Sequence, residues 1–431
     1  MAALATKGAD EHVLGKEKVE EYMNRKFTSE EKKHLHSPNF SSMSPLQKDV
    51  LAVMKIALQE EFSKIENKDS DLLQDNRIYR FLQGQLFNLK DGVAFMKKAI
   101  AWRSESSVEN IASNIRSKKE EGDSFMRIEK APFWKEVSPV YPSISFFEGF
   151  ASDVHFQHDK EGHPLIINQL GMSDISTISD GSLKEEEMVL FMTHLAEMRA
   201  LHLSKLSQER QEIVRCFCLQ DLNGLGLKHL ASKPRYFIKL FISIMSDCYP
   251  EIMAKIRIIN APWAFSMAWT MVKPWLPERT IKKIKVLGSN YQDELLEEFD
   301  PVQLPKAYGG TLDVRLPALV PADSDVDAVT VSRSSQETIS FPVKRDASFS
   351  FKFQCDAGDI NVKVEFSRSG DVTKPTLLNS MERKSMSSTE IKVPSDADGN
   401  LSVTFDNTFS WVKSKTVRYS FVEERSSPTK L

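Results

Sequence analysis

Few side chains in this sequence are spaced for catalysis or for binding a metal. Cys216 and Cys218 lie two residues apart, but no second pair of ligands follows at the spacing of a zinc site. Neither a GxGxxG phosphate loop nor a GxSxG nucleophile elbow is present. Three histidines surround one short polar turn, which we interpret as a solvated loop: His155, His158 and His163. The residue types therefore favour a protein that is not an enzyme and holds no metal or chemical cofactor.

The chain has the composition of an ordinary globular protein. Of its 431 residues, 41% are hydrophobic and 27% are charged, and the formal net charge is −3. This length predicts two or three domains, and the lack of a basic excess argues against nucleic acid as a partner. Four cysteines are too few for a disulfide framework in so long a chain. With neither a signal-peptide core nor an apolar run of about 18 residues, the sequence predicts a cytosolic protein that meets membranes only peripherally.

The first predicted segments are a flexible N-terminus and a small helical subdomain. Residues 1–43 are polar, with few large apolar side chains in any period, and we expect them to be flexible. Ser44 is a good N-cap and Pro45 suits the first helical position, so a helix is predicted to begin there. Apolar residues then recur at helical spacing, which predicts helices throughout residues 44–118.

Over residues 119–314 the pattern changes to strands that alternate with amphipathic helices. Short apolar runs predict four buried strands, near residues 164–169, 213–219, 256–260 and 284–287. Large apolar residues at helical spacing predict one helix around Met188–Met198 and another around Phe237–Met245. This order implies an α/β fold with a mostly parallel sheet and right-handed crossovers.

A different fold class is predicted for the C-terminal part of the chain. Residues 315–335 are rich in Pro, Asp and Ser and have the composition of a linker. Apolar and polar residues then alternate, as at Phe349, Phe351 and Phe353, and turns that contain Asp and Gly separate the runs. We therefore expect an all-β antiparallel sandwich over residues 336–424, followed by a short tail at 425–431.

The α/β region resembles the CRAL-TRIO family of lipid-binding and lipid-transfer proteins. The resemblance covers roughly residues 70–312 and rests on motifs in the family's order: Tyr79-Arg-Phe-Leu82, Ala101-Trp-Arg103, Asp159-Lys-Glu-Gly-His-Pro164, Asp221-Leu-Asn-Gly-Leu-Gly-Leu-Lys-His-Leu230, Tyr249-Pro-Glu251, Ile259-Asn-Ala-Pro262, Val272-Lys-Pro-Trp-Leu276, Lys285-Val-Leu-Gly288 and Leu304-Pro-Lys-Ala-Tyr-Gly-Gly310. It implies a helical N-terminal subdomain, a sheet that forms the floor of an apolar lipid pocket, and a mobile helix that closes the pocket.

The C-terminal sandwich resembles a GOLD domain. Phe405-Asp-Asn-Thr-Phe-Ser-Trp411 followed by Lys415 matches the family signature, and Ile339-Ser-Phe-Pro342 matches its opening. A CRAL-TRIO domain followed by a GOLD domain is similar to the arrangement in proteins related to supernatant protein factor, also called tocopherol-associated protein. The resemblance implies contact with a protein partner or a membrane. Trp411, Lys413 and Lys415 would then be either anchoring residues or ordinary parts of the sandwich.

The first resemblance implies where a bound lipid would lie. The lid would run from about Trp263 to Trp275 and is rich in aromatic and methionine side chains, which adapt well to irregular acyl chains. The same pattern also fits an ordinary buried helix. The pocket residues come from the lid, from the helix around Phe237–Met245 and from the strands: Ile166, Cys216, Cys218, Phe237, Leu240, Phe241, Ile244, Trp263, Phe265 and Trp269.

The resemblance also implies a polar end for the pocket. The positions that recognise inositol phosphate in the founding member correspond to Glu251, Thr280 and Lys283, where a phosphate would find a cation and a hydroxyl donor. Three further cations would add positive potential: Arg279, Lys282 and Lys285. The alternative for this stretch is a solvated helix start that is capped by Thr280.

Other positions depart from the founding member. The run Gln83-Gly-Gln85-Leu86 stands where an Arg–Lys pair lies beside the phosphate. Cys216 and Cys218 replace hydroxyl residues that bind phosphocholine, and Ile166 replaces a tyrosine. Thiols are weak hydrogen-bond donors, so the pocket is predicted to be more apolar. This favours phosphatidylinositol or a neutral isoprenoid or sterol-like lipid over phosphatidylcholine.

The sequence therefore predicts a monomeric, cytoplasmic carrier that shields one lipid in a gated pocket. It would deliver this lipid between membranes or present it to enzymes, with transient contact to Golgi or other endomembranes. The alternative is a lipid-sensing adaptor that recruits a secretory or signalling partner through the GOLD domain. The third interpretation, an enzyme of the same layered fold, has no motif to support it.

Overall fold

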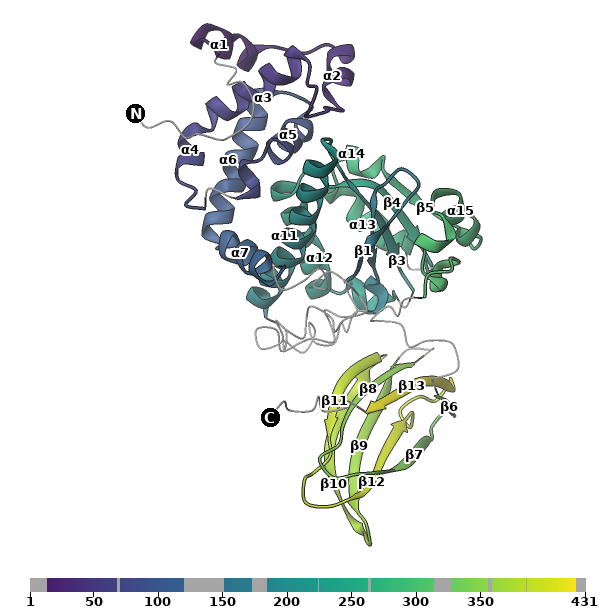
Figure 1. Cartoon of the computed structure of the whole chain (residues 1–431). Helices are drawn as coiled ribbons and strands as arrows, with labels where there is room; N and C mark the ends of the chain where they lie inside the picture. Colours follow the sequence, from purple (N-terminus) through teal and green to yellow (C-terminus); the bar gives the residue numbers. More distant parts are fainter. Residues whose placement is uncertain are drawn as a thin grey trace.

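The first part of the chain is a bundle of helices, which we call the helical subdomain. The computed structural model describes residues 14–67, 70–119, 151–172, 184–223, 225–262, 265–313, 327–355, 359–384 and 386–423. The helices of the subdomain are α1 (Lys16–Asn24), α2 (Ser29–Leu35), α3 (Pro45–Ala57), α4 (Gln59–Ser63), α5 (Asp75–Gly84), α6 (Leu89–Glu105) and α7 (Val108–Lys119) (Figure 1). The predicted helix start is confirmed, because the Ser44 hydroxyl accepts a hydrogen bond from the Gln47 N–H at 3.3 Å and Pro45 is the first helical residue.

Residues 14–43 are folded, so the prediction of a flexible segment is wrong for them. Tyr22 and Leu35 are buried in the same core as α3, α5 and α6. The Leu35 carbonyl also accepts a hydrogen bond from the Tyr79 hydroxyl at 2.8 Å. The segment folds because single large side chains, too widely spread to show a period, each fill a gap between the longer helices. Residues 1–13 lie outside the described residues.

The central sheet has five strands in the order β1-β2-β3-β4-β5. β2 (Pro164–Asn168), β3 (Cys216–Asp221), β4 (Met253–Ile259) and β5 (Ile284–Val286) are parallel, which confirms the predicted mostly parallel sheet. β1 (Ala151–His158) is antiparallel to β2 at one edge and is absent from the sequence prediction. Its sequence mixes polar and apolar residues and lacks the continuous apolar run of strands that are buried on both faces.

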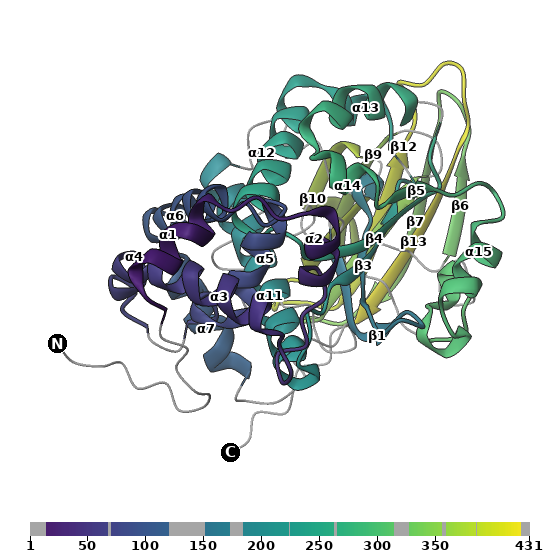
Figure 2. The same cartoon turned by 90° about the horizontal axis from the view of Figure 1, so that it is seen from above.

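Helices cover both faces of the sheet, because alternate residues of each strand point to opposite faces. On one face, Ile166 and Cys216 pack in a core with α11 (Glu185–Arg210) and α12 (Ser232–Cys248). On the other face, Phe217 packs near α15 (Tyr291–Glu298), with its ring 4.8 Å from that of Phe299. Figure 2 shows α12 and α15 at opposite sides of the strands. None of the described helices is both long and apolar enough to cross a membrane.

The C-terminal part is a sandwich of two antiparallel sheets, as predicted. Its strands are β6 (Asp327–Val331), β7 (Gln336–Val343), β8 (Ser348–Cys355), β9 (Ile360–Arg368), β10 (Asp371–Lys384), β11 (Met386–Lys392), β12 (Gly399–Asp406) and β13 (Lys415–Glu423). They pair in the orders β10-β9-β12-β7 and β11-β8-β13-β6. The inward side chains form one core, in which Phe351 and Phe421 stack with ring centroids 4.3 Å apart.

The predicted linker over residues 315–335 is wrong at its C-terminal end, because β6 begins at Asp327. β6 pairs with β13 along its whole length at the edge of one sheet. Of its five residues only Val331 is buried and only Val329 is partly buried, so the alternation is too short to stand out in the sequence. The strand is held by main-chain hydrogen bonds to β13, and a pattern of side chains does not reveal such bonds. The earlier part of the predicted linker, up to residue 326, lies outside the described residues.

A group of buried charges joins the helical subdomain to α11. Glu197 of α11 is fully buried, pairs with Arg103 of α6, and lies 3.8 Å from Arg77 of α5. Arg77 pairs in turn with Asp71 at 3.1 Å, and Arg103 with Glu109 at 2.6 Å. Buried charges are stable only when they are paired, so this group holds α5 and α6 in one position against α11.

Candidate functional site

A cavity of about 300 Å³ lies between the sheet, α12 and α13 (Phe265–Val272). Part of its floor is the face of β4 that carries Ile256 and Ile258. β4 has a neighbouring strand on each side, and parallel strands of this kind are normally buried on both faces. On the face that borders the cavity, Ile258 is buried, but Ile256 is nevertheless only partly buried. The strand is therefore open towards the cavity, where a bound molecule would cover it.

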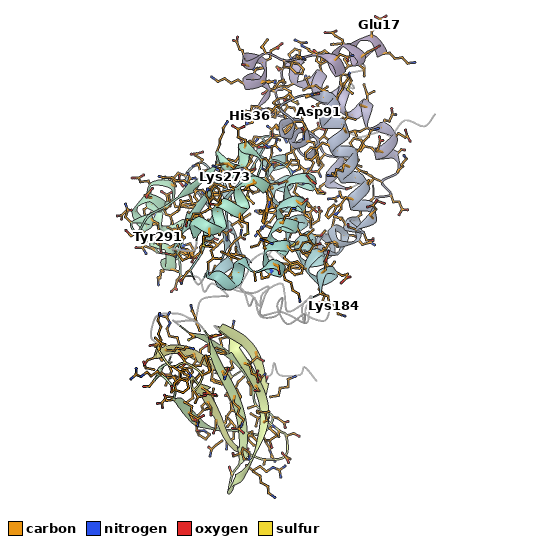
Figure 3. All side chains as sticks on the ribbon, turned by 180° about the vertical axis from the view of Figure 1, so that it is seen from behind. Glu17, His36, Asp91, Lys184, Lys273 and Tyr291 are labelled. Carbon is orange, nitrogen blue, oxygen red and sulfur yellow. The ribbon has the colours of Figure 1, made fainter. Side chains whose placement is uncertain are left out.

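The cavity is closed by α13 and the following turn Lys273–Trp275, which together we call the lid. Phe265 and Trp269 line the cavity one helical turn apart and stack with ring centroids 6.0 Å apart. Met267, between them, is 56% exposed, and only Ala268 of this apolar helix is buried. Lys273, at the start of the turn, is exposed and is labelled in Figure 3. A helix with so little buried surface can move away from the sheet at low cost.

The predicted pocket residues fall into two groups. One group lines the cavity: Cys218, Phe237, Phe241, Phe265 and Trp269. The other packs behind the cavity wall, in the core between the sheet, α11 and α12: Ile166, Cys216, Leu240 and Ile244. Trp263 lies outside the described residues. Periodicity identifies the apolar face of an element, but it does not tell which members of that face border a void.

One end of the cavity carries a cluster of charges, which we call the polar end. The Glu251 side chain is 5% exposed and pairs with Lys283 and Arg279, each at 2.9 Å. The Arg215 guanidinium lies 3.8 Å from the same carboxylate. Lys283 also donates a hydrogen bond to the Met253 carbonyl at 2.8 Å. One carboxylate thus faces three cations, so the polar end has an excess of positive charge and suits an anion such as a phosphate.

A fourth cation, Arg80 of α5, fixes the backbone at Glu251. The buried Arg80 guanidinium donates hydrogen bonds to the Glu251 carbonyl at 2.7 Å and to the Val214 carbonyl at 2.5 Å. Glu251 has a φ of +56°, a left-handed conformation that costs a residue other than glycine about 1–3 kcal/mol. The hydrogen bond from Arg80 helps to offset this cost. The helical subdomain therefore helps to hold the central carboxylate of the polar end.

Burial shifts the pKa values at the polar end. Burial raises the pKa of Glu251, but the charges of Lys283 and Arg215 outweigh this effect and lower it, so the carboxylate is ionised at neutral pH. Burial lowers the pKa of Lys283 and of Arg215, and Glu251 opposes this only in part. Burial, together with the charge of Arg215, lowers the pKa of Arg80 to about 9. These cations are held where their charge is costly, and an anionic ligand would stabilise them.

The predicted headgroup residues lie together at the polar end. Glu251 and Lys283 form an ion pair, and Thr280 lines the same cavity. Arg279 adds its charge there, as expected. Two other cations expected at this place instead form surface ion pairs with acidic neighbours: Lys282 and Lys285. Their side chains are mostly exposed, because α14 (Glu278–Ile281) and β5 present them to solvent.

Arg80 and Arg215 were not predicted as site residues. Each arginine lies beside or within a buried apolar run, where a charge needs a partner. This placement is the feature of the sequence that could have identified them. The run Gln83–Leu86 carries no charge, yet it contacts Arg215 and Arg279 of the polar end. Gln83 accepts a hydrogen bond from Arg215 at 2.9 Å, and the Gly84 carbonyl accepts one from Arg279.

Neutral polar side chains lie at the other end of the cavity, at the C-terminal ends of the parallel strands. The Asn168 amide donates to the Gln220 side-chain oxygen at 3.3 Å, and both residues line the cavity. Arg199 donates to Asn168 at 2.9 Å, and the Asn168 amide lies 3.5 Å from the Cys218 sulfur. These amides can donate to or accept from a hydroxyl group. The cavity therefore combines a cationic end and a neutral polar edge.

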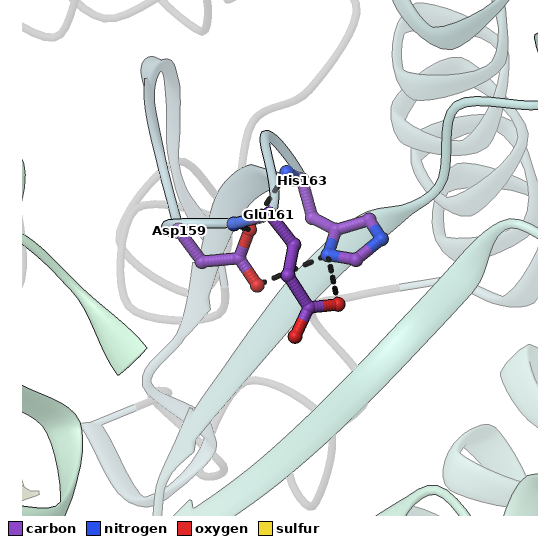
Figure 4. Close-up of side chains that lie close together, drawn as sticks. All are labelled: Asp159, Glu161 and His163. Carbon is purple, nitrogen blue, oxygen red and sulfur yellow. Dashed lines mark hydrogen bonds and ion pairs between the residues drawn. The ribbon is translucent and has the colours of Figure 1, made fainter. Parts of the chain in front are cut away.

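Asp159, Glu161 and His163 lie close together in the turn between β1 and β2, as three potential metal ligands (Figure 4). One Asp159 oxygen accepts hydrogen bonds from the Glu161 and His163 N–H groups at 3.0 and 2.8 Å. The other lies 3.0 Å from the His163 ring and 3.2 Å from Lys255. The carboxylate thus stabilises the turn from inside, while Lys160 and Glu161 are exposed, as expected of a solvated loop. The His155 side chain lies outside the described residues.

We expect Asp159 to stabilise the fold in a pH-dependent way. Burial raises its pKa, but the His163 hydrogen bonds and Lys255 outweigh this effect and lower it to about 2, whereas an unfolded aspartate titrates near about 3.9. Its contribution is therefore present above about pH 4 and is lost as the pH falls to about 2. Asp159→Asn should lower the free energy of unfolding at neutral pH by about 2 kcal/mol. Urea denaturation at several pH values checks this, and a difference that does not shrink in acid would contradict it.

One family model matches the part of the chain that builds this site. It is described as the CRAL/TRIO domain and matches residues 153–310. That range contains the floor of the cavity, the lid and, apart from Arg80, the cations of the polar end. The cavity and its charges thus belong to the portion that the family shares.

Curated proteins from fungi and a plant match more than half of the chain. The Sec14 cytosolic factor of Schizosaccharomyces pombe is 31% identical over 243 residues, which are 56% of this chain and 76% of that protein. The SEC14 cytosolic factor of Eremothecium gossypii is 28% identical over 243 residues, 56% of this chain and 71% of that protein. The phosphatidylinositol/phosphatidylcholine transfer protein SFH4 of Arabidopsis thaliana is 30% identical over 236 residues, 54% of this chain and 34% of that protein.

Proposed function

Since the chain belongs to the CRAL/TRIO domain family, we propose that it is a soluble lipid-transfer protein and not an enzyme. The cavity beneath the lid shields one lipid, which the protein delivers between membranes or presents to an enzyme. The observation that supports this most directly is the cavity face of β4, where Ile256 is only partly buried under a weakly packed lid. Such a face is an incomplete core, and an apolar ligand completes it.

The walls of the cavity suit a long hydrocarbon chain. Each methylene group that leaves water contributes about 0.8 kcal/mol, so about ten of them contribute roughly 8 kcal/mol before the costs of binding. Flexible apolar side chains from α11 and α12 surround this space: Met188, Met192, Phe241 and Met245. Methionines in particular adapt to irregular partners, because the unbranched thioether side chain has several rotatable bonds.

We propose phosphatidylinositol as the principal ligand and a neutral isoprenoid or sterol-like lipid as the second class. The three cations around Glu251 suit the phosphate, and Glu251 itself can accept hydrogen bonds from inositol hydroxyls. The amides of Asn168 and Gln220 suit the single hydroxyl of a neutral lipid. The relative from Arabidopsis thaliana bears the name of a phosphatidylinositol/phosphatidylcholine transfer protein, which also supports the first class.

Two measurements on the full chain test the proposal. Native mass spectrometry of the purified protein identifies the lipid that is retained, and a vesicle assay follows labelled phosphatidylinositol from donor to acceptor membranes. We expect transfer that rises in proportion to protein concentration. A lipid that co-purifies but does not move would favour a lipid-sensing adaptor. A retained lipid that is chemically altered during incubation would contradict a non-enzymatic role.

Lys283→Ala should selectively reduce phosphatidylinositol binding. A hydrogen bond between charged groups contributes about 1.5–3 kcal/mol, so the affinity should fall roughly 10- to 100-fold. Lys282→Ala is the matched control, because Lys282 is next in sequence, 74% exposed and paired with Glu278 on the surface. Competition binding with phosphatidylinositol and with a sterol measures the effect. An equal loss for both lipids would show that Lys283 has a structural role only.

We propose further that the C-terminal sandwich is a GOLD domain that acts at Golgi or other endomembranes. The signature residues Phe405 and Asn407 have structural roles that support this assignment. Phe405 is buried in the sandwich core, and the buried Asn407 side chain donates to backbone carbonyls on both sides of its loop. Imaging of the full chain and of the Asn407→Ala variant in cells tests the location, and a diffuse distribution of both would contradict it.

A further inference from the structure

The loop of residues 407–414, between β12 and β13, exposes two apolar side chains that the proposed cavity does not use. Trp411 is 79% exposed and Val412 is 80% exposed. Among the described residues no other large apolar side chain is as exposed as these two. When a tryptophan side chain stays in solvent, the fold does not gain the free energy of removing its large apolar surface from water. This loop therefore presents to solvent the kind of side chain that normally packs.

Hydrogen bonds hold the loop in this form. Asn407 is fully buried, and its Nδ2 group donates to three backbone carbonyls at 3.0–3.4 Å: those of Val331, Ser332 and Lys413. The Ser410 N–H donates to the Asn407 carbonyl at 3.0 Å, and the Ser410 carbonyl accepts from the Ser334 N–H at 2.9 Å. These bonds hold the loop backbone on both sides of Trp411 and Val412, in a form that leaves the two side chains in solvent. The exposure of Trp411 is thus part of the fold.

Two cations flank the exposed pair. Lys413 follows Val412 directly, and Arg333 lies in the β6–β7 turn that is hydrogen-bonded to the loop. Both side chains are exposed, and neither forms an ion pair within the described part of the chain. Lys415 differs, because it is buried, 3.7 Å from the Asp359 carboxylate and 4.2 Å from the Phe409 ring centroid. Lys415 is therefore an ordinary part of the sandwich, which is the second of the two alternatives that the sequence left open.

We propose that Trp411 and Val412 anchor the protein to the surface of an anionic lipid membrane. Tryptophan is favoured at the membrane–water interface, because its ring is apolar with one polar N–H. With the pair inserted, Lys413 and Arg333 lie at the depth of the anionic headgroups. A stable protein interface buries about 800 Å² on each partner, far more than two side chains provide, whereas peripheral anchoring needs only a few apolar residues beside cations. The choice of a membrane rests on the proposed carrier function, since a carrier must meet the bilayers that it serves.

Co-sedimentation of the full chain with vesicles tests this anchor. The vesicles contain phosphatidylcholine alone or phosphatidylcholine with phosphatidylserine. We expect binding to the anionic vesicles that falls roughly tenfold in Trp411→Ser and in Val412→Ser, because each loses one inserted apolar side chain. Lys413→Glu should lower it at least about fivefold, because a cation near an anionic surface is replaced by an anion. Binding to the neutral vesicles should be weaker throughout.

Matched controls come from the same sandwich. Leu377 and Lys374 are exposed residues of β10, and Leu377→Ser and Lys374→Glu should bind like the unchanged chain. If Trp411→Ser does not fold, fluorescence quenching by brominated lipids tests the anchor instead. The tryptophan emission of the unchanged chain should fall on binding to such vesicles, and it should fall less in the conservative variant Trp411→Phe. Equal binding of the Trp411 variants and the unchanged chain, or no binding to anionic vesicles, would overturn the proposal.

Two further results separate this proposal from others. Native mass spectrometry should show normal lipid loading in Trp411→Ser, because the loop does not line the cavity. Absence of lipid from the unchanged chain would count against the carrier function, while lost vesicle binding in the variant would still support the anchor. A protein captured through Trp411, in a chain that binds no vesicles, would assign the loop to a protein partner and overturn the membrane proposal.

Discussion

Replacing Trp269 by aspartate should abolish lipid loading while the fold persists. Trp269 lines the cavity from the lid, and its ring stacks on that of Phe265. A carboxylate at this position would have to lose its water beside an acyl chain, at a cost of at least about 3 kcal/mol. Such a cost corresponds to more than roughly a hundredfold loss of affinity. Native mass spectrometry of the purified variant should therefore find the protein without lipid.

The same substitution two residues earlier is the control. Met267 lies on the outer side of the same helix and is 56% exposed, so Met267→Asp places the same charge in water. We expect this variant to load normally. Normal loading of Trp269→Asp would show that the ligand does not lie beneath the lid. Loss of loading in both variants would show that the helix itself had unfolded, and circular dichroism of each variant checks that outcome.

Replacing Glu197 by alanine should lower the free energy of unfolding by about 3–5 kcal/mol. The Glu197 carboxylate is fully buried beside Arg103 and Arg77, whose side chains are each 2% exposed. Without it, two buried guanidinium groups face each other with less compensation, and each then keeps one acidic neighbour, Glu109 or Asp71. Chemical denaturation followed by tryptophan fluorescence measures this loss.

Two other variants serve as comparisons for Glu197→Ala. Glu197→Gln keeps the shape and the acceptor oxygen but removes the charge, so its effect should lie between those of the unchanged chain and the alanine variant. Glu60→Ala removes an exposed partner of Lys64, an i,i+4 pair on the surface, and should cost less than about 0.5 kcal/mol. A cost for Glu197→Ala as small as that for Glu60→Ala would show that the buried group does not join the two parts of the chain.

Much of the fold could be predicted from the sequence, because its pattern reports burial. The runs that became β2 and β3 are mostly apolar and β4 ends in an apolar pair, as is typical of strands in a parallel sheet. β1 and β6 were missed for the opposite reason. Both are edge strands held by main-chain hydrogen bonds, and few of their side chains need to be apolar. Helices α1 and α2 were missed because scattered single side chains show no period.

The charges of the candidate site could be predicted only in part. Lys283 and Glu251 were found through family resemblance, which aligns positions one by one. Arg80 and Arg215 are far apart in sequence and meet only because α5 packs beside the start of β3. Which apolar residues reach the cavity could not be predicted either, since Cys218 and Cys216 share a strand face and only Cys218 lines it. A void is a property of three-dimensional packing, and no single segment encodes it.

The open face of β4 has a consequence for how this protein exists when no lipid is bound. A central strand that is only partly buried at Ile256, where it borders the cavity, leaves the fold with a core whose last component is not encoded in the chain. A ligand that binds only the folded form stabilises that form, and the effect grows with the concentration of the ligand. The supply of lipid and the amount of folded carrier are therefore thermodynamically linked. Each delivery then returns the molecule to its less stable form, and the cell's lipid supply helps to set how much carrier it can keep.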